Sequence, residues 1–299
     1  MSSVVLLIGC FLLGIVAKRF SSLPRDSQKG INAWVLYVSI PALVIRLIHS
    51  VPLKLELIWA VLGLWVIFAV PAVVALQWAK RAPLQRNALA GAMALCMGLG
   101  NTAFVGYPLL GMLGGPSAVG IGAVVDQLGT FVLVSIGAVP LATHLSGREV
   151  SVPKVLGRLF TFPPLVALGV ALASRHFELP VMLDEVLEKL AGMVTPLALA
   201  SVGWQFEPST LRGNGRLVSM GLAFKLVAAP LLVLGLMRLV HSDAQVERVA
   251  VVQAAMAPMV TAGVLADAFN LDGRLAAALI AVGTPLSLVT VPVWWWLLS

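Results

Sequence analysis

The most restrictive feature of the sequence is a succession of apolar stretches, each long enough to cross a lipid bilayer as a helix. A spanning helix needs roughly 20 mainly apolar residues. Charges and Gly/Pro clusters divide the 299 residues into ten such stretches, and no connection is long enough to hold a soluble domain. Charged residues make up 11% of the chain, against about 25% in ordinary soluble proteins. The sequence therefore predicts an all-α polytopic membrane protein with ten transmembrane helices, near residues 3–19, 31–49, 57–79, 87–112, 117–142, 157–174, 184–205, 216–240, 247–269 and 274–298.

The distribution of Lys and Arg predicts the orientation of these spans. With the N-terminus outside, the inner connections hold thirteen of the 20 basic residues and the outer ones six, while Lys225 lies inside a span. This positive-inside bias predicts a multi-pass protein of the cell (inner, cytoplasmic) membrane with both termini outside. The net charge of +7 does not indicate nucleic-acid binding, because the basic residues are scattered in short connections instead of forming a stripe.

The two halves of the chain correspond weakly, which indicates an internal repeat. The matched positions are Ile40–Leu43 with Thr195–Leu199, Pro71 with Pro230, and Gly129–Thr130 with Gly283–Thr284. Each half holds five spans, and because five is odd the second copy must enter the membrane upside down. We therefore expect two inverted five-helix repeats, residues 1–145 and 152–299, an architecture characteristic of secondary transporters.

Spans 4 and 9 are both interrupted where the chain should lie at membrane depth. Span 4 breaks at Gly100–Pro108 (GNTAFVGYP), and span 9 breaks at Ala257–Gly263 (APMVTAG). Irregular backbone at this depth is tolerated only inside protein or along a cavity, and broken helices offer N–H groups, C=O groups and helix dipoles to a ligand. One break alone could be a packing kink. The paired breaks favour a binding site where broken crossover helices 4 and 9 meet.

Two ionisable side chains are predicted to lie deep in the spans. Asp126 in span 5 has no basic neighbour within a helical turn and is the best candidate for a proton or cation site. Lys225 in span 8 could neutralise Asp126 or attract an anion. Charges inside a membrane are functional by default, although a buried pair that fixes helix packing is the alternative. Asp267 is expected at the solvated inner end of span 9.

Uncharged polar residues near the breaks form a second group of candidates. Asn101, Thr102, Gln127 and Thr261 could contact a ligand or bridge neighbouring helices. The chain contains no HExxH, GxSxG or Walker-type pattern, and its four histidines have no ligand-like spacing. We therefore expect neither an enzyme nor an ATP-driven pump, and no cofactor or metal site beyond a coupling proton or sodium ion.

Taken together, these motifs resemble those of the auxin efflux carrier family over essentially the whole chain. That family includes the plant PIN carriers and bacterial organic-acid permeases annotated for malonate or malate, and it shares a superfamily with the bile acid:sodium symporters. The most specific part of the resemblance is the Asn-x-x-Phe-x-Gly-x-Pro segment. The resemblance is carried by Gly14–Arg19, Asn32, Tyr37–Leu43, Gly100–Pro108, Thr195–Leu199, Lys225, Ala257–Pro258 and Val264–Ala266.

The resemblance implies a scaffold of spans 1, 2, 6 and 7 and a moving transport unit of spans 3–5 and 8–10, with elevator-like motion, often in a homodimer. Asn101, Pro108 and Pro258 match the crossover positions of the family. The plant carriers have an acidic and a basic residue in span 3, whereas residues 57–79 here contain neither. The long soluble loop of the plant carriers is also missing, so the bacterial short-loop branch is the nearer relative.

The expected function is that of a secondary active transporter, a permease that carries small organic anions (carboxylates) by alternating access. The alternatives are a sodium-coupled carrier of bulkier amphipathic anions of the bile-acid type and a non-transporting membrane anion sensor. The expected partners are the organic anion and the lipid bilayer. The expected substrate-binding residues are Asn101, Thr102, Gly106, Pro108, Pro258, Thr261 and Lys225, and the expected ion-coupling residues are Asp126 and Gln127.

Overall fold

The computed structural model describes residues 2–20, 23–24, 26–48, 54–80, 84–147, 157, 161–206 and 215–299, and these residues are mainly helical. The first half contains α1 (Ser2–Phe20), α2 (Ser27–Trp34), η1 (Val35–Ser39), α3 (Ile40–Ile48), α4 (Leu57–Ala79), α5 (Leu84–Gly98), α6 (Gly106–Val125), η2 (Asp126–Phe131), η3 (Val134–Ala138) and α7 (Val139–Leu145). The second half contains α9 (Pro163–Ala173), α10 (Val181–Gly192), α11 (Val194–Gln205), α12 (Gly215–Ala223), η5 (Phe224–Ala228), α13 (Ala229–Leu239), α14 (Ala244–Ala254), α15 (Val260–Ala268) and α16 (Gly273–Leu297). The η elements are short π-helices that continue the neighbouring α-helices.

Six helical stretches among the described residues are long and apolar enough to cross a membrane. They are Ser27–Ile48, Leu57–Ala79, Gly106–Leu145, Val181–Gln205, Gly215–Leu239 and Gly273–Leu297. The longest is divided at Gly115, which has a φ of +68°, a conformation that glycine adopts without steric cost. This break falls between predicted spans 4 and 5. The chain is thus a multi-pass helical protein, while the count of ten spans stays a prediction.

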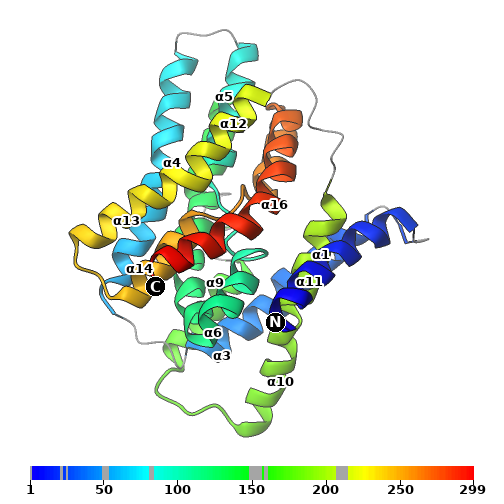
Figure 1. Cartoon of the computed structure of the whole chain (residues 1–299), viewed down its shortest axis with the longest axis vertical. Helices are drawn as coiled ribbons and strands as arrows, with labels where there is room; N and C mark the ends of the chain where they lie inside the picture. The colour runs from blue at the N-terminus through cyan, green and yellow to red at the C-terminus, as the bar shows by residue number, and fades with distance from the viewer. Residues whose placement is uncertain are drawn as a thin grey trace.

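The helices pack in two groups around a buried centre (Figure 1). In one group α1 lies along α11, and α3 packs on α9 and α10; in the other α4 packs on α5, and α13 packs on α14. The backbones of α1 and α11 come very close, because a Cβ on Gly14 would overlap Ala200 and a Cβ on Gly203 would overlap Phe11. Small residues commonly allow such close contact between membrane helices.

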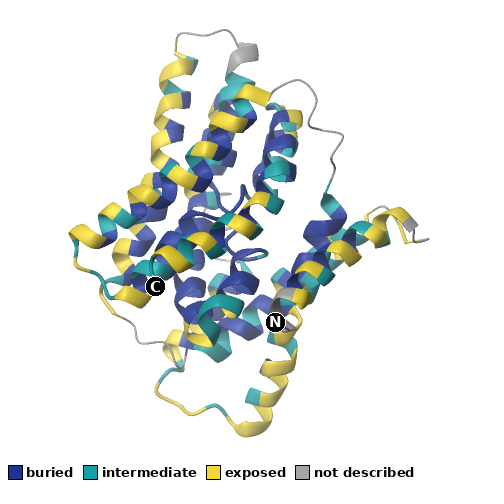
Figure 2. Cartoon of the chain, viewed as in Figure 1, coloured by how far each residue is buried: buried dark blue, intermediate teal, exposed yellow. Residues whose placement is uncertain are grey.

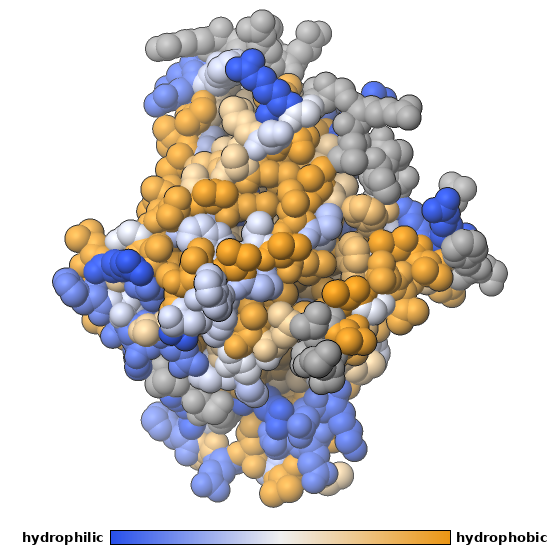
Figure 3. Space-filling view, in the orientation of Figure 1, coloured by the Kyte–Doolittle hydropathy of each residue, from blue (hydrophilic) through white to orange (hydrophobic). Residues whose placement is uncertain are grey.

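Burial is concentrated in the middle of the molecule, as the dark blue helices of Figure 2 show. The outer faces are also apolar: Leu13 on α1, Val74 on α4 and Val289 on α16 are all exposed. Hydrophobic side chains cover much of the face seen in Figure 3, and hydrophilic ones gather toward its edges. Both cysteines, Cys10 and Cys96, are free and buried, as expected of small hydrophobic residues. An apolar exterior of this extent is suited to lipid.

Candidate functional site

Two interrupted helices cross at the centre of the molecule. The first interruption lies between α5 and α6, and the second lies between α14 and α15. They meet in an antiparallel β-bridge between Gly100 and Pro258. The Asn101 amide N–H donates to Ala257 O at 2.8 Å, and the Met259 N–H donates to Leu99 O at 3.0 Å. The paired breaks predicted in spans 4 and 9 are therefore in direct contact.

Local chemistry explains why the helices stop here. Pro258 has no amide N–H to continue the hydrogen bonding of α14. Asn101 O accepts from Val105 N at 3.3 Å and Gly106 N at 3.1 Å, which turns the chain into α6. Pro108 lies in the first turn of α6, where a missing N–H costs little. The backbone at the crossover is thus irregular but hydrogen-bonded and enclosed by protein.

Asp126 is buried at the centre of a cluster of polar side chains. Thr102 Oγ1 donates to Asp126 Oδ1, while Tyr107 OH donates to Oδ2 at 2.6 Å and Gln127 Nε2 donates to the same oxygen at 2.9 Å. Thr102 Oγ1 also lies 3.0 Å from Thr130 Oγ1. Three donors on one carboxylate offset part of the free energy lost when the charge leaves water.

Lys225 lies at the crossover, next to Gly100, without an anionic partner among the described residues. Its side chain is 1% exposed, and a Cβ built on Gly100 would lie 3.1 Å from Lys225 Nζ. Among the described residues, no hydrogen bond or ion pair is made by this ammonium group. The Asn101 Nδ2 amide is also buried without a hydrogen-bond partner. The crossover thus presents two unused donors, one of them charged.

Of the two alternatives for Lys225, an ion pair with Asp126 is not found in the part of the chain that the structure describes. Asp126 accepts from the Thr102, Tyr107 and Gln127 side chains, and Lys225 lies against the backbone of Gly100 instead. Two ionisable residues in different spans can both lie near the crossover and still not contact each other. The spacing of the two residues in the sequence does not reveal which groups each side chain contacts.

The other predicted site residues lie at or beside the crossover. Pro108 is buried, and Thr261 is partly buried in the first turn of α15. Gly106 packs on Gln253, because a Cβ at position 106 would lie 2.8 Å from Gln253 Oε1. Gln253 is fully buried, and its Nε2 donates to Gly122 O at 3.0 Å.

Sequence reasoning missed Tyr107, Thr130 and Gln253. All three are buried, and each is a polar residue in an apolar run at predicted membrane depth. That pattern was the available signal, because a polar group at such depth needs a partner. Gln253 in particular is the one amide side chain between Val249 and Met259.

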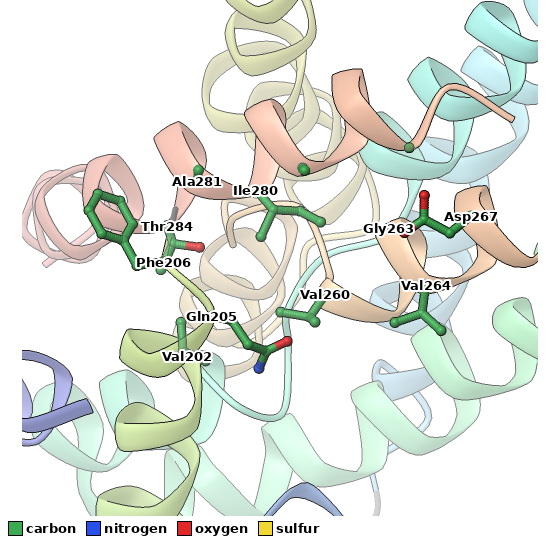
Figure 4. Close-up of a pocket in the computed structure, with 12 residues that line it drawn as sticks. Val202, Gln205, Phe206, Val260, Gly263, Val264, Asp267, Ile280, Ala281 and Thr284 are labelled. Atoms are coloured by element: carbon green, nitrogen blue, oxygen red, sulfur yellow. The ribbon is translucent and has the colours of Figure 1, made fainter. Parts of the chain in front are cut away.

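A cavity of about 180 Å³ lies beside the crossover, between α11, α15 and α16. Figure 4 shows Val260, in the first turn of α15, near its centre and Gln205, Thr284 and Asp267 around it. Met259, which precedes α15, provides no side-chain cap for the helix. The first amide N–H groups of a helix have no partner within it. The start of α15 therefore offers backbone donors next to the cavity.

The broken helices cross at a buried polar centre, inside a molecule with an apolar exterior. These features are those of a polytopic membrane protein whose candidate site lies where helices are interrupted. The chain belongs to the membrane transport protein family, whose sequence model matches residues 1–295. This match confirms the resemblance to the auxin efflux carrier family.

Similar proteins cover nearly the same length. An uncharacterized transporter of Methanothermobacter thermautotrophicus is 26% identical over 95% of this chain and 93% of its own. An uncharacterized transporter of Methanocaldococcus jannaschii is 25% identical over 100% of this chain and 98% of its own. A Rhizobium meliloti protein that carries the name "Putative malonate transporter" is 26% identical over 95% of this chain and 91% of its own. The family and these relatives are transporters.

Proposed function

We propose that the protein is a secondary active transporter of small organic anions, with the carboxylate held at the crossover. The observation that carries this proposal is Lys225, a buried ammonium beside Gly100 with no anionic partner among the described residues. Burying an unpaired charge costs several kcal/mol. A site that keeps such a charge is best explained by an anion that arrives from outside the chain.

Other donors at the crossover suit a carboxylate. Asn101 Nδ2 is a buried donor without a partner, and the uncapped start of α15 adds backbone N–H groups and the positive end of a helix dipole. Charge-assisted hydrogen bonds of this kind are the stronger ones in proteins. The family name supports a transport function, and the name of the Rhizobium relative supports an acid as the carried molecule. The cavity beside the crossover has a volume of about 180 Å³ and is lined by residues of α11, α15 and α16, not by Lys225. This volume is below the usual range for drug-sized ligands, roughly 300–1,000 Å³, so the cavity suits a small acid better than a bile-type anion.

Asp126 is our candidate for the coupling group. Its carboxylate accepts from Thr102, which is the neighbour of Asn101 in the chain. A proton or a sodium ion bound at Asp126 would change the hydrogen bonds of Thr102. Because Thr102 is part of the broken segment, this change would alter the crossover. Gln127, which donates to the same carboxylate at 2.9 Å, belongs to this coupling cluster.

Two related packing patterns support the inverted repeat of residues 1–145 and 152–299. Gly129 packs on Leu64 of α4, and Gly283 packs on Leu222 of α12, so matched small residues contact matched helices. Contacts of α1 with α11 likewise have a counterpart in contacts of α9 with α3.

On this basis spans 1, 2, 6 and 7 form a scaffold, and spans 3–5 and 8–10 move past it like an elevator. Alternating access requires that substrate stabilise the states that interconvert. We further propose the cell membrane as the location, with both termini outside, and a homodimer as the assembly.

Uptake into liposomes tests this proposal. Purified protein is reconstituted, and uptake of radiolabelled malonate, malate, an indole-type acid and a bile acid is measured under imposed pH or sodium gradients. We expect one of the three acids other than the bile acid to be carried, uptake to fall at least tenfold in Asn101→Ala, and gradient dependence to disappear in Asp126→Asn. Glu185→Gln, an exposed change on α10, is the control. Binding of an acid without movement under any gradient would contradict the carrier and favour a sensor.

A further inference from the structure

The cavity beside the crossover begins at the start of α15, and its other end carries a negative charge. Asp267 lines this cavity together with Val260 and Gly263. These three residues are spaced three and four positions apart along α15 and therefore share one face of the helix. Asp267 comes seven positions after Val260, a distance of about 10 Å along a helix. The cavity thus runs from the positive start of α15 to a carboxylate two turns later.

The Asp267 carboxylate lies against the backbone of Gly273. A Cβ built on residue 273 would overlap Asp267 Oδ1, so glycine at that position leaves room for the acid. Asp267 is solvent-exposed. Within the ranges that the structure describes, no basic side chain forms an ion pair with it. The charge is therefore present at the cavity and is not neutralised by a neighbour.

The wall between the two ends is mostly apolar. It is formed by side chains such as Phe206, Ile280 and Ala281. Thr284 interrupts this wall: its side chain is 3% exposed, and its Oγ1 has no hydrogen-bond partner. Figure 4 shows this hydroxyl directed into the space between α11 and α15. A buried polar atom without a partner, next to the uncapped start of α15, points to a ligand that supplies the missing hydrogen bond.

We propose that Asp267 is a specificity-determining residue that selects monocarboxylates with an apolar body and rejects dicarboxylates. The inference rests on the proposed function, since it takes the substrate to be an organic anion bound at the crossover. With one carboxylate at the start of α15 and Thr284, the body of the acid lies along the apolar wall toward Asp267. The second carboxylate of a diacid lies on the side of the cavity that holds Asp267, and the like charge repels it. An apolar end meets no such charge.

Butyrate and succinate test this proposal, because they share a four-carbon skeleton and differ in the second carboxylate. Binding of each acid to the purified protein is measured by thermal stabilisation in detergent, and uptake of each radiolabelled acid is measured in liposomes with protein-free liposomes as background. The variants are Asp267→Asn, which keeps the size of the side chain beside Gly273, and Glu185→Gln, an exposed carboxylate-to-amide change on α10 as the matched control.

We expect wild type and Glu185→Gln to prefer butyrate, and Asp267→Asn to reduce this preference by about tenfold, less at high salt. An unchanged ratio in Asp267→Asn, or a wild-type preference for succinate, would overturn the role of Asp267. The two proposals can fail separately. Binding that follows the expected ratios without any uptake contradicts the carrier alone, whereas uptake with an unchanged ratio contradicts Asp267 alone. If neither acid binds any form, both proposals are wrong.

Discussion

Lys54 and Asp243 form an ion pair outside the spans, with Lys54 Nζ 2.8 Å from Asp243 Oδ2. This hydrogen bond lowers the pKa of Asp243 below its ordinary 3.8 and raises the pKa of Lys54 above its ordinary 10.5. Asp243 also caps α14, because its Oδ1 accepts from Gln245 N at 2.9 Å. One carboxylate therefore joins the start of α4 to the start of α14.

The lowered pKa of Asp243 predicts a dependence of stability on acid. The stabilisation is complete above the unfolded-state pKa and is lost as pH falls through the folded-state value, so the relevant window lies below pH 3.8. The effect is small, since the pair is partly exposed. Asp243→Asn retains the cap and should remove this part of the acid dependence in melting curves recorded in detergent. Asp243→Ala should lose about 1 kcal/mol more through the cap. Identical acid profiles for wild type and Asp243→Asn would contradict this account.

Sequence reasoning located the deep charges and grouped Gln127 with Asp126, but it did not place Thr102 or Tyr107 on this carboxylate. Asp126 and Lys225 are recognisable because a charge inside an apolar run is costly. The partners of Asp126, above all Tyr107 and Thr102, lie 19 and 24 positions away along the chain, and only the folding of α6 onto the crossover brings them together. The absence of an ion pair between Asp126 and Lys225 has the same origin.

At the scale of elements, α1 and α11 approach each other through glycine. Gly14 faces Ala200 and Trp204, and Gly203 faces Phe11, with no room for a Cβ at either glycine. This contact joins two helices that we assign to the scaffold. A rigid scaffold of this kind suits a transport unit that moves against it.

Gly203→Ala should destabilise the protein, because the added methyl group must push α1 away from α11. Overpacking costs about 1–3 kcal/mol, so the melting temperature in detergent should fall. Gly169→Ala on α9 is the matched control. Nothing lies within 4 Å of a Cβ at position 169, and alanine is the better helix former by about 1 kcal/mol. Equal melting temperatures for Gly203→Ala and Gly169→Ala would show that the close contact has no energetic role.

The breaks in the helices were predicted from the sequence, and the π-helices were not. The sequence indicated interruptions at Gly100–Pro108 and Ala257–Gly263, and the structure has α5 ending at Gly98 and α14 ending at Ala254. Proline, glycine and asparagine leave a local signature there. Three of the described π-helices, η1, η3 and η5, end two residues before a proline, at Pro41, Pro140 and Pro230. Proline lacks the N–H that would continue the α-helical hydrogen bonds and crowds the carbonyl of the preceding turn, so a local signal was present at these places as well.

For the molecule as a whole, the ring contact between Phe131 and Phe162 joins the two units that we expect to move. The ring centroids lie 3.5 Å apart and the planes are 8° from parallel. Phe131 belongs to η2, and Phe162 directly precedes α9; we propose η2 as part of the transport unit and α9 as part of the scaffold. Relative motion of the units must separate these rings.

Joining these positions should therefore stop transport. In a Phe131→Cys, Phe162→Cys double variant, a disulfide formed by oxidation should abolish uptake, and a reductant should restore it. A short reagent that joins the two thiols should also abolish uptake. The two single variants serve as controls under the same treatment. Full uptake by the cross-linked protein would contradict an elevator that moves at this contact.

Uptake by a Lys225→Met variant in liposomes tests the central claim most directly, which is that the unpartnered buried Lys225 holds the anion. Methionine keeps much of the length and apolar character of the side chain, so the fold should persist, and loss of an isolated buried charge should leave the melting temperature equal or higher. Lys189→Met, at an exposed position on α10, is the control. Loss of uptake by at least about a hundredfold, or 2.7 kcal/mol in kcat/KM, with a folded protein is the predicted result. Uptake equal to that of Lys189→Met would contradict the account.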